Sequence, residues 1–195
     1  GGVTAITSCT TPTRPLIASC DPEYSNPAPC LARWDGSNWA PTYDGLRYGG
    51  ALPYVYSFIQ DSSGTLYIGG LFSHFGNTQL NNVARWDGSA WQSVGGGVNG
   101  YVYGLAISPA TGNLFAIGNF TQAGGNPAQF VARWNGSSWS ALGTGLNMEP
   151  RALTFDTGGN LYVAGMFTMA GGVPANRIAK WNGSTWSALG SGLTG

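Results

Sequence analysis

Few side chains in this sequence could carry out chemistry, and their placement argues against an active site. Among its 195 residues the chain has one histidine, His74, and eight Asp or Glu residues that are spread singly. A Ser-His-Asp arrangement would need His74, which has no acid near it in sequence and follows an expected strand in a loop rich in Asn and Gly. The sequence therefore predicts that the protein is not an enzyme and has no catalytic residues.

The loops that could hold an ion or a phosphate lack the residues that such sites need. No acidic loop of the DxDxDG type, which would bind calcium, occurs in the chain. The Gly-rich loops at 123–126 and 170–173 join expected strands, open no helix and carry no Lys, so they do not match phosphate-binding loops. We therefore expect no metal site, no cofactor-binding residues and no cofactor.

The three cysteines, Cys9, Cys20 and Cys30, all lie in the first thirty residues. None forms a CxxC pair, so a zinc site is not expected, and a disulfide between two of them favours an oxidising compartment. Aligning 26–28 with 126–128 (both Asn-Pro-Ala) places Cys20 just after the second strand of its repeat and Cys30 at the start of the third. We predict a Cys20–Cys30 disulfide, with Cys9 as the odd cysteine in a turn at the opposite end.

The composition is typical of a secreted β protein. Charged residues make up 8% of the chain, against roughly 25% in ordinary domains, and the net charge is zero. This balance gives no electrostatic case for nucleic acid or an anionic membrane, and no apolar run is long enough to insert into a membrane. We expect an extracellular protein, secreted or at the cell surface. The glycosylation sequons, which matter only if a eukaryote secretes the chain, are at Asn119, Asn135 and Asn182.

One nine-residue hairpin sequence, called the hairpin phrase below, occurs four times in the chain, which predicts a repeat fold. It reads LARWDGSNW, VARWDGSAW, VARWNGSSW and IAKWNGSTW, with a tight-turn dipeptide, Asp-Gly or Asn-Gly, at each centre. Each period of 47–52 residues divides into four short strands, and no helical period appears. This pattern predicts an all-β fold, a β-propeller built from four four-stranded blades in a single domain or segment over 1–195. The expected blades are 1–43, 46–95, 98–143 and 146–191.

Two sets of residues recur at fixed positions in the four repeats. The tryptophans are expected to pack between neighbouring blades, since aromatic side chains dominate core energetics. The basic residues are expected on the opposite sheet face as framework, bonded to a carbonyl or to Asp61 or Asp156. The sets are Trp34, Trp39, Trp86, Trp91, Trp134, Trp139, Trp181 and Trp186, and Arg33, Arg85, Arg133 and Lys180.

The phrases GGxPANxIAKWNGSxWSALGSGL and GNLYVAGMFTxAGG resemble those of extracellular propellers of the kelch-like, galactose-oxidase type, including the fungal cortical-marker propellers. The likeness runs over 160–193 and 112–146, and more loosely over 64–97; residues 1–30 depart most. It implies a β-propeller and little about activity, because propellers host many functions. The copper-ligand pattern of galactose oxidase has no counterpart in this sequence.

The resemblance also raises the question of how the propeller closes. Most relatives have six or more blades, and this chain begins with an inner strand and ends with an outer one, so the usual clasp is missing. Three arrangements stay open: a closed four-bladed ring, two chains in an eight-bladed ring, or a segment of a polymer. We expect a structural or adhesive module that assembles with other copies or other surface proteins. The alternative is a lectin-like propeller that binds glycans between blades.

Overall fold

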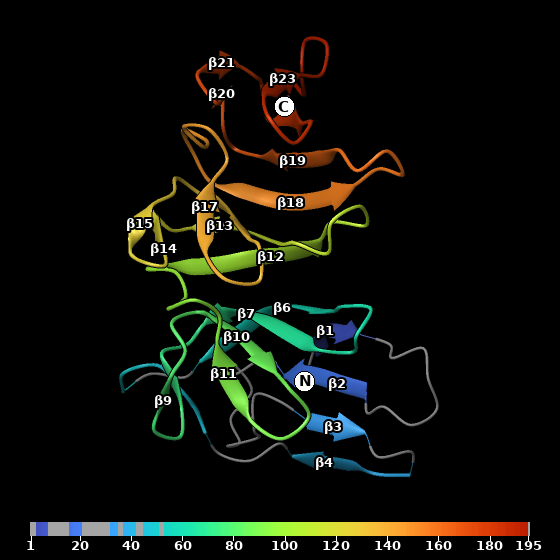
Figure 1. The fold of residues 1–195 in the computed structure, drawn as a ribbon, viewed down its shortest axis with the longest axis vertical. Helices are drawn as coiled ribbons and strands as arrows, with labels where there is room; N and C mark the ends of the chain where they lie inside the picture. The colour runs from blue at the N-terminus through green and yellow to red at the C-terminus, as the bar shows by residue number, and fades with distance from the viewer. Residues whose placement is uncertain are drawn as a thin grey trace.

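Every regular element in the described part of the chain is a β-strand. The computed structural model describes residues 3–7, 16–20, 32–34, 37–41, 45–50 and 53–194, and it describes side chains from Gly45 onward and at 37–38. The expectation of an all-β protein is therefore confirmed (Figure 1). In these segments no helix has the length and hydropathy needed to cross a membrane.

The strands form four four-stranded antiparallel sheets that follow one another along the chain (Figure 1). The first contains β1 (Val3–Thr7), β2 (Leu16–Cys20), β3 (Ala32–Trp34) and β4 (Trp39–Pro41). The second contains β6 (Tyr54–Gln60), β7 (Leu66–Leu71), β10 (Val83–Trp86) and β11 (Trp91–Ser93). The third contains β12 (Tyr101–Ile107), β13 (Leu114–Asn119), β16 (Val131–Trp134) and β17 (Trp139–Ala141). The fourth contains β18 (Pro150–Phe155), β19 (Leu161–Gly165), β22 (Ile178–Trp181) and β23 (Trp186–Ala188).

Short strands tie each described linker to the sheet that follows it. The linker strand β5 pairs with β8, as Val98 bridges to Ala123 and Leu146 to Ala170 at the later linkers. A small separate hairpin, inserted in the chain between the second and third strands of each of the last three sheets, receives the linker. The short strands are β5 (Leu46–Arg47), β8 (His74–Phe75), β9 (Thr78–Gln79), β14 (Gln122–Ala123), β15 (Asn126–Pro127), β20 (Met169–Ala170) and β21 (Val173–Pro174).

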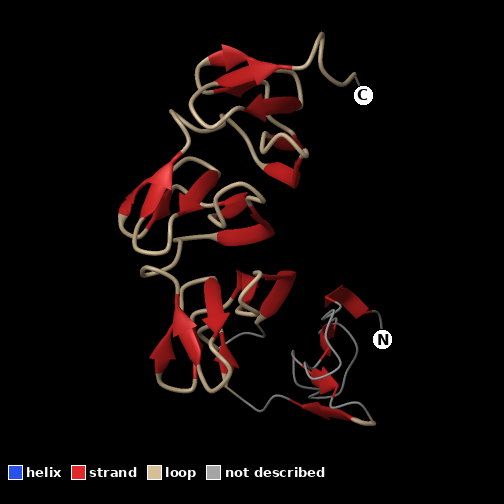
Figure 2. Ribbon diagram, turned by 45° about the vertical axis from the view of Figure 1, so that its right-hand side comes forward, coloured by secondary structure: helices blue, strands red, loops and turns tan. Residues whose placement is uncertain are grey.

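The first strands of the sheets, β1, β6, β12 and β18, lie next to one another in that order. Figure 2 shows the sheets following an open arc in which the first and fourth lie apart. Contact between these strands explains the small residues found there. The Ser57 hydroxyl accepts the Leu105 N–H at 3.0 Å, and a Cβ on Gly104 would lie 2.6 Å from Leu153 Cδ2.

The core lies between sheets rather than inside any one of them. One apolar cluster joins the second sheet to the third, with Val83 packed near Trp134 and Trp139. An equivalent cluster joins the third to the fourth, with Phe115 and Ile117 on one side. We call the face of a sheet toward the next sheet in sequence its forward face, and the other its rear face. Each described interface thus joins a forward face to the rear face of the following sheet.

The tryptophans of the third and fourth sheets belong to these interfaces, and those of the second sheet belong to a third cluster with residues of their own sheet and the linker before it. Their paired positions lie directly opposite across the hairpin, and their ring centroids are 5.4–5.7 Å apart. Five of the six are buried and the sixth, Trp86, is half-buried. The side chains of Trp34 and Trp39 lie outside the described residues, although the same register pairs them.

The hairpin turns between the tryptophans are held by one side chain each. Asp87 Oδ1 accepts the backbone N–H groups of Ser89 and Ala90 at 2.9 and 3.0 Å. Asn135 and Asn182 make the equivalent bonds in the next two sheets. These two N–H donors, together with the Ser89 hydroxyl, lower the pKa of Asp87 to about 2. The turn is therefore built around an acceptor oxygen that is stronger in the ionised aspartate than in the protonated one, whereas the amide oxygen of asparagine does not titrate.

We expect acid to weaken this turn in the native protein but not in Asp87→Asn. Because the folded pKa lies below the ordinary value of 3.8, the ionised carboxylate contributes stability above about pH 4, and this contribution is lost as pH falls toward about 2. The melting temperature, followed by circular dichroism from pH 7 to pH 2, should fall less for Asp87→Asn than for the native chain. In the reciprocal control, Asn135→Asp, the melting temperature should fall more steeply with acid than in the native chain. Equal pH profiles for all three proteins would contradict the role assigned to the ionised Asp87 in the turn.

Candidate functional site

Two successive first strands begin with the same Tyr-Val-Tyr sequence and bring four tyrosines together. Tyr54 and Tyr56 lie on β6, and Tyr101 and Tyr103 lie on β12, the strand beside it. At the next first strand, β18, the corresponding positions are Glu149, which directly precedes the strand, and Arg151, which lies on it. We call the six residues the tyrosine strip: Tyr54, Tyr56, Tyr101, Tyr103, Glu149 and Arg151.

A β-bulge at the same position of each first strand displays this strip. The pairing with the second strand shifts between Val55 and Ser57, between Val102 and Gly104, and again in β18 around Arg151. A bulge leaves one residue out of the ladder and re-aims its side chain. The residues left out are Tyr56, Tyr103 and Arg151. The bulges therefore place three side chains at equivalent positions on three neighbouring sheets.

The second strands carry a glycine opposite each bulge in the last three sheets. Val55 pairs with Gly70 and Val102 with Gly118. A Cβ at either glycine would overlap the carbonyl oxygen of the tyrosine that precedes the valine. In the first sheet, Cys20 occupies this register position opposite Val3.

The tyrosine rings are in continuous contact. Tyr54 stacks on Tyr56 with centroids 5.9 Å apart, and Tyr56 meets Tyr103 edge-to-face at 6.0 Å across the two sheets. Tyr103 lies 6.1 Å from Tyr101. These distances fall in the range of favourable aromatic pairs, so the rings form one unbroken surface.

An ion pair closes the end of the strip on the fourth sheet. Arg151 Nη2 lies 2.9 Å from Glu149 Oε2, and the guanidinium carbon sits 4.8 Å from the centre of the Tyr103 ring. The Tyr103 hydroxyl donates to Glu149 Oε2 at 3.3 Å. Burial raises the pKa of Tyr103 above its ordinary value, and the Glu149 carboxylate raises it further. Burial likewise raises the pKa of Tyr56, so these phenols stay protonated, as donors, at neutral pH.

Much of the strip remains open to solvent. Tyr56 and Tyr101 are 38% and 37% exposed, and the Arg151 side chain is 54% exposed. Within the described residues, Tyr54, Tyr56 and Tyr101 make no hydrogen bond through their hydroxyls. The strip therefore offers aromatic faces, free phenol hydroxyls and one ion pair on a single surface.

A second candidate surface is the forward face of the fourth sheet. The linker residues Val98 and Leu146 are 3% and 4% exposed because the hairpin of the following sheet covers them, whereas the equivalent Leu193 is 49% exposed. Val131 on the third forward face is fully buried, and its equivalent Ile178 is only half-buried. The fourth sheet thus carries the apolar residues of an interface, and no described sheet lies against them.

A hydrogen bond between sheets recurs at the two described interfaces, and the forward face of the fourth sheet has no described counterpart of it. Trp139 Nε1 donates to the Val94 carbonyl of the preceding sheet at 2.7 Å, and Trp186 Nε1 donates to Leu142 at 2.8 Å. The next carbonyl in this series is that of Leu189, which accepts the Gly192 N–H in its own turn. No tryptophan of the described chain reaches Leu189, which is half-buried where Val94 and Leu142 are buried.

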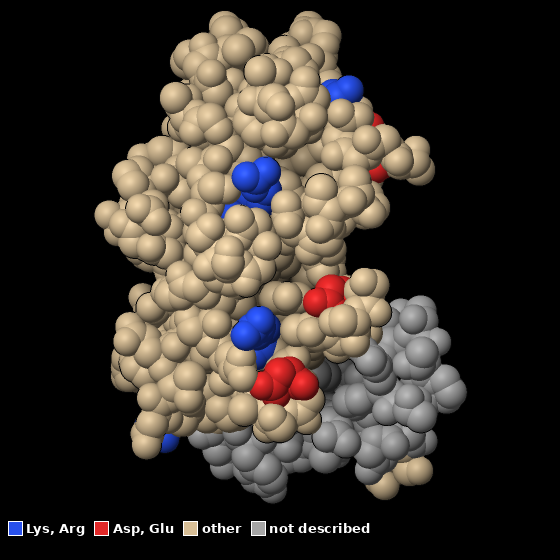
Figure 3. Space-filling view, viewed as in Figure 1, with Lys and Arg blue, Asp and Glu red and all other residues tan. Residues whose placement is uncertain are grey.

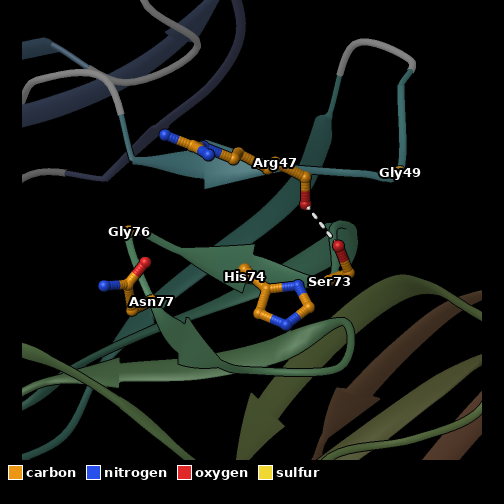
Figure 4. Close-up of a pocket in the computed structure, with 6 residues that line it drawn as sticks. All are labelled: Arg47, Gly49, Ser73, His74, Gly76 and Asn77. Atoms are coloured by element: carbon orange, nitrogen blue, oxygen red, sulfur yellow. Dashed lines mark hydrogen bonds between the residues drawn. The ribbon is translucent and has the colours of Figure 1, made fainter.

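His74 lies in an open hollow beside the short strands rather than in an acid–base cluster. Figure 4 shows the hollow lined by Arg47, Ser73, His74, Asn77 and two glycines, with the Ser73 hydroxyl bonded to the Arg47 carbonyl at 2.9 Å. His74 belongs to β8 instead of following a strand end as expected. No carboxylate lines the hollow, and no group of three potential metal ligands occurs in the described segments.

Two of the recurring basic residues, Arg85 and Arg133, bond across their hairpin. Arg85 Nη2 donates to Gln92 Oε1 at 2.9 Å, and Arg133 Nε donates to Ser140 Oγ at 3.3 Å. The expected partner Asp61 instead holds the turn at Ser63 and Thr65, and Asp156 is bonded to Asn160 and Tyr162. Charged residues on the face shown in Figure 3 are sparse and of both signs, with a basic and an acidic group side by side near the grey part, so no patch of a single charge sign marks a site there.

The other predicted site residues lie at the surface or outside the described part of the chain. The sequon asparagines Asn119, Asn135 and Asn182 are exposed. Cys9, Cys30 and the side chains of Cys20 and Arg33 lie outside the described residues, so the predicted disulfide stays a prediction. Lys180 is half-buried on the fourth forward face.

Sequence reasoning missed the tyrosine strip. Its signal was available as two Tyr-Val-Tyr triplets 47 positions apart, beginning at Tyr54 and Tyr101. The first strands begin at Tyr54, Tyr101 and Pro150. Each contains a bulge, which interrupts the regular alternation of side-chain direction along the strand and which sequence periodicity does not reveal.

Comparison with known proteins supports the fold and leaves the function open. No family model and no curated protein sequence matches this chain. Among solved structures, the chain is similar to the extracellular domain of a protein from B. thetaiotaomicron assigned as a one-component system. The TM-score is 0.57 and the identity 11%, over 90% of this chain and 21% of the solved chain. This chain thus spans about a fifth of that chain's length.

Proposed function

We propose that this chain is a non-enzymatic, extracellular β-propeller segment whose four sheets are blades, and that it serves as a structural or adhesive module by assembling head to tail with other copies. The observation that carries this proposal is the uncovered forward face of the fourth sheet. Leu193 is 49% exposed at a position where the equivalent residues are 3% and 4% exposed. A large apolar side chain left open at a repeated interface favours association.

The propeller assignment is supported by the way the sheets repeat. Each described sheet is a four-stranded antiparallel meander, and the four first strands lie side by side as inner strands would around an axis. The likeness to a solved extracellular domain and the kelch-like sequence phrases agree with a secreted propeller. We assign the blades to 1–43, 46–95, 98–143 and 146–191, within which the four sheets fall.

The first sheet of a second copy carries the residue types that a rear face uses to cover the forward face of the sheet before it. In the fourth sheet, Leu161 pairs with Trp181, and Trp181 pairs with Trp186, in the rear face that covers the third sheet. The first sheet repeats these pairings with residues of the same kind: Leu16 with Trp34, and Trp34 with Trp39. We therefore propose that the first sheet of one copy covers the fourth sheet of another.

Measuring the particle mass of the chain tests this proposal. Size-exclusion chromatography with light scattering should show species larger than the 20.3 kDa monomer at micromolar concentration. A stable dimer indicates an eight-bladed ring, and a mass that grows with concentration indicates a polymer; either supports the proposal. A monodisperse monomer at every concentration would overturn it.

A charge placed on the forward face of the fourth sheet should prevent assembly. We expect Ile178→Asp to be monomeric, because association would bury an unpaired carboxylate against the tryptophans of the next copy. The matched control is Val173→Asp, which changes a 41% exposed residue in the hairpin of the same sheet and should assemble like the native chain. Equal masses for the native chain and Ile178→Asp would contradict the assigned interface.

A further inference from the structure

The tyrosine strip leaves large aromatic side chains exposed to solvent. Tyr56 and Tyr101 leave more than a third of their surface in water, although both are large aromatic residues. Three hydroxyls in the strip have no partner in the described chain, while Tyr103 is bonded to Glu149. The bulges that present these side chains recur on three neighbouring strands, and bulges of this kind are frequent beside binding sites.

We propose that the tyrosine strip is a carbohydrate-binding site for a neutral oligosaccharide. The apolar C–H faces of the sugar rings would lie on Tyr56 and Tyr101, and the phenol hydroxyls would bond the sugar hydroxyls. Glu149 and Arg151 would accept and donate hydrogen bonds at the end of the strip. This inference is independent of assembly, because the strip is formed by the second, third and fourth sheets of one chain.

The geometry favours a sugar over a proline-rich peptide. Peptides in the polyproline conformation bind aromatic-lined grooves. In the strip, Tyr54, Tyr56, Tyr103 and Tyr101 follow one another at 5.9–6.1 Å between centroids, which leaves no space between neighbouring rings. A continuous aromatic surface instead suits a ligand with flat apolar faces and polar edges.

The charge of the strip excludes nucleic acid as the favoured ligand. Binding to a phosphate backbone depends on several cationic side chains. The strip has only Arg151, which is paired with Glu149 at 2.9 Å, and the whole chain has no net charge. An uncharged ligand that uses both members of the ion pair through hydrogen bonds fits this balance.

Titration calorimetry of the native 195-residue chain with cellohexaose, chitohexaose, xylohexaose and mannohexaose tests the proposal. We expect at least one of these sugars to bind, with an affinity that hardly changes between low and high salt. Tyr56→Ala and Tyr101→Ala should each weaken binding by at least about tenfold. The matched control is Tyr48→Ala, which removes a 38% exposed tyrosine outside the strip and should bind like the native chain.

A second measurement keeps the test independent of the folding of the variants. Titrating the bound sugar into the native chain should shift the NMR signals of the tyrosine ring protons, and Tyr56→Phe should retain part of the binding. Failure of all four sugars to bind at millimolar concentration would overturn the proposal, as would equal weakening by Tyr48→Ala. Binding of decaproline in place of the sugars would assign the strip to a peptide. A monomeric chain that binds a sugar would reject the proposed assembly and leave this site standing.

Discussion

Replacing Trp139 with alanine is expected to lower the free energy of unfolding by about 3–5 kcal/mol, the cost of truncating a large buried aromatic side chain. The Trp139 ring is 5% exposed and lies in the cluster between the second and third sheets. Its indole N–H also bonds the Val94 carbonyl at 2.7 Å. The substitution therefore removes apolar contact and a cross-sheet hydrogen bond together.

Trp139→Phe separates these two contributions. It keeps much of the ring and loses the donor, so we expect a smaller loss, of about 1–2 kcal/mol. Urea unfolding followed by far-ultraviolet circular dichroism measures both variants without relying on tryptophan emission. A loss below about 1 kcal/mol for Trp139→Ala would show that the interface between sheets does not depend on its tryptophans, contrary to the burial seen here.

The second large effect is expected for Gly118→Ala. A Cβ at this position would overlap the Tyr101 carbonyl oxygen across the β12–β13 pair. A backbone atom cannot turn aside as a side chain can, so we expect a loss of about 1–3 kcal/mol from overpacking. The displaced strand carries Tyr101 and Tyr103, and therefore the substitution should also weaken any ligand of the tyrosine strip.

Gly50→Ala is the matched control for Gly118→Ala. Gly50 is exposed, and a Cβ added there would meet no atom within 4 Å. Urea unfolding should show the native stability for Gly50→Ala and a lower midpoint for Gly118→Ala. Equal midpoints would mean that the bulge relaxes without cost and that the glycine has no steric role.

The outer hairpins could be predicted from sequence because each one is specified locally. The turn dipeptide sets the register, and that register places Trp86 opposite Trp91 and Trp134 opposite Trp139. The side chain that holds the turn, Asp87 or Asn135, is part of the same phrase. All the information for these strands lies within nine residues, so the sequence alone located them.

The tyrosine strip could not be predicted in the same way because it depends on contacts between repeats. Tyr56 meets Tyr103 only because β6 and β12 lie side by side, and both tyrosines are displaced by bulges that sequence alternation does not reveal. The partner of Arg85 was missed for a different reason, because it lies within the same hairpin. Gln92 lies directly opposite Arg85 in the hairpin register, whereas the expected partners were a carbonyl or the acids Asp61 and Asp156.

The clusters between sheets have a consequence for how such a chain changes over evolutionary time. Two of the described apolar clusters each join two adjacent sheets, the third draws on the second sheet and the linker before it, and none gathers side chains from all the described sheets. Because one type of interface joins forward face to rear face at both described junctions, a duplication or deletion of one complete repeat there would preserve the form of the remaining junction. Copy number can therefore vary by recombination between repeats at little structural cost, while a partial repeat would leave a tryptophan pair without its opposing face.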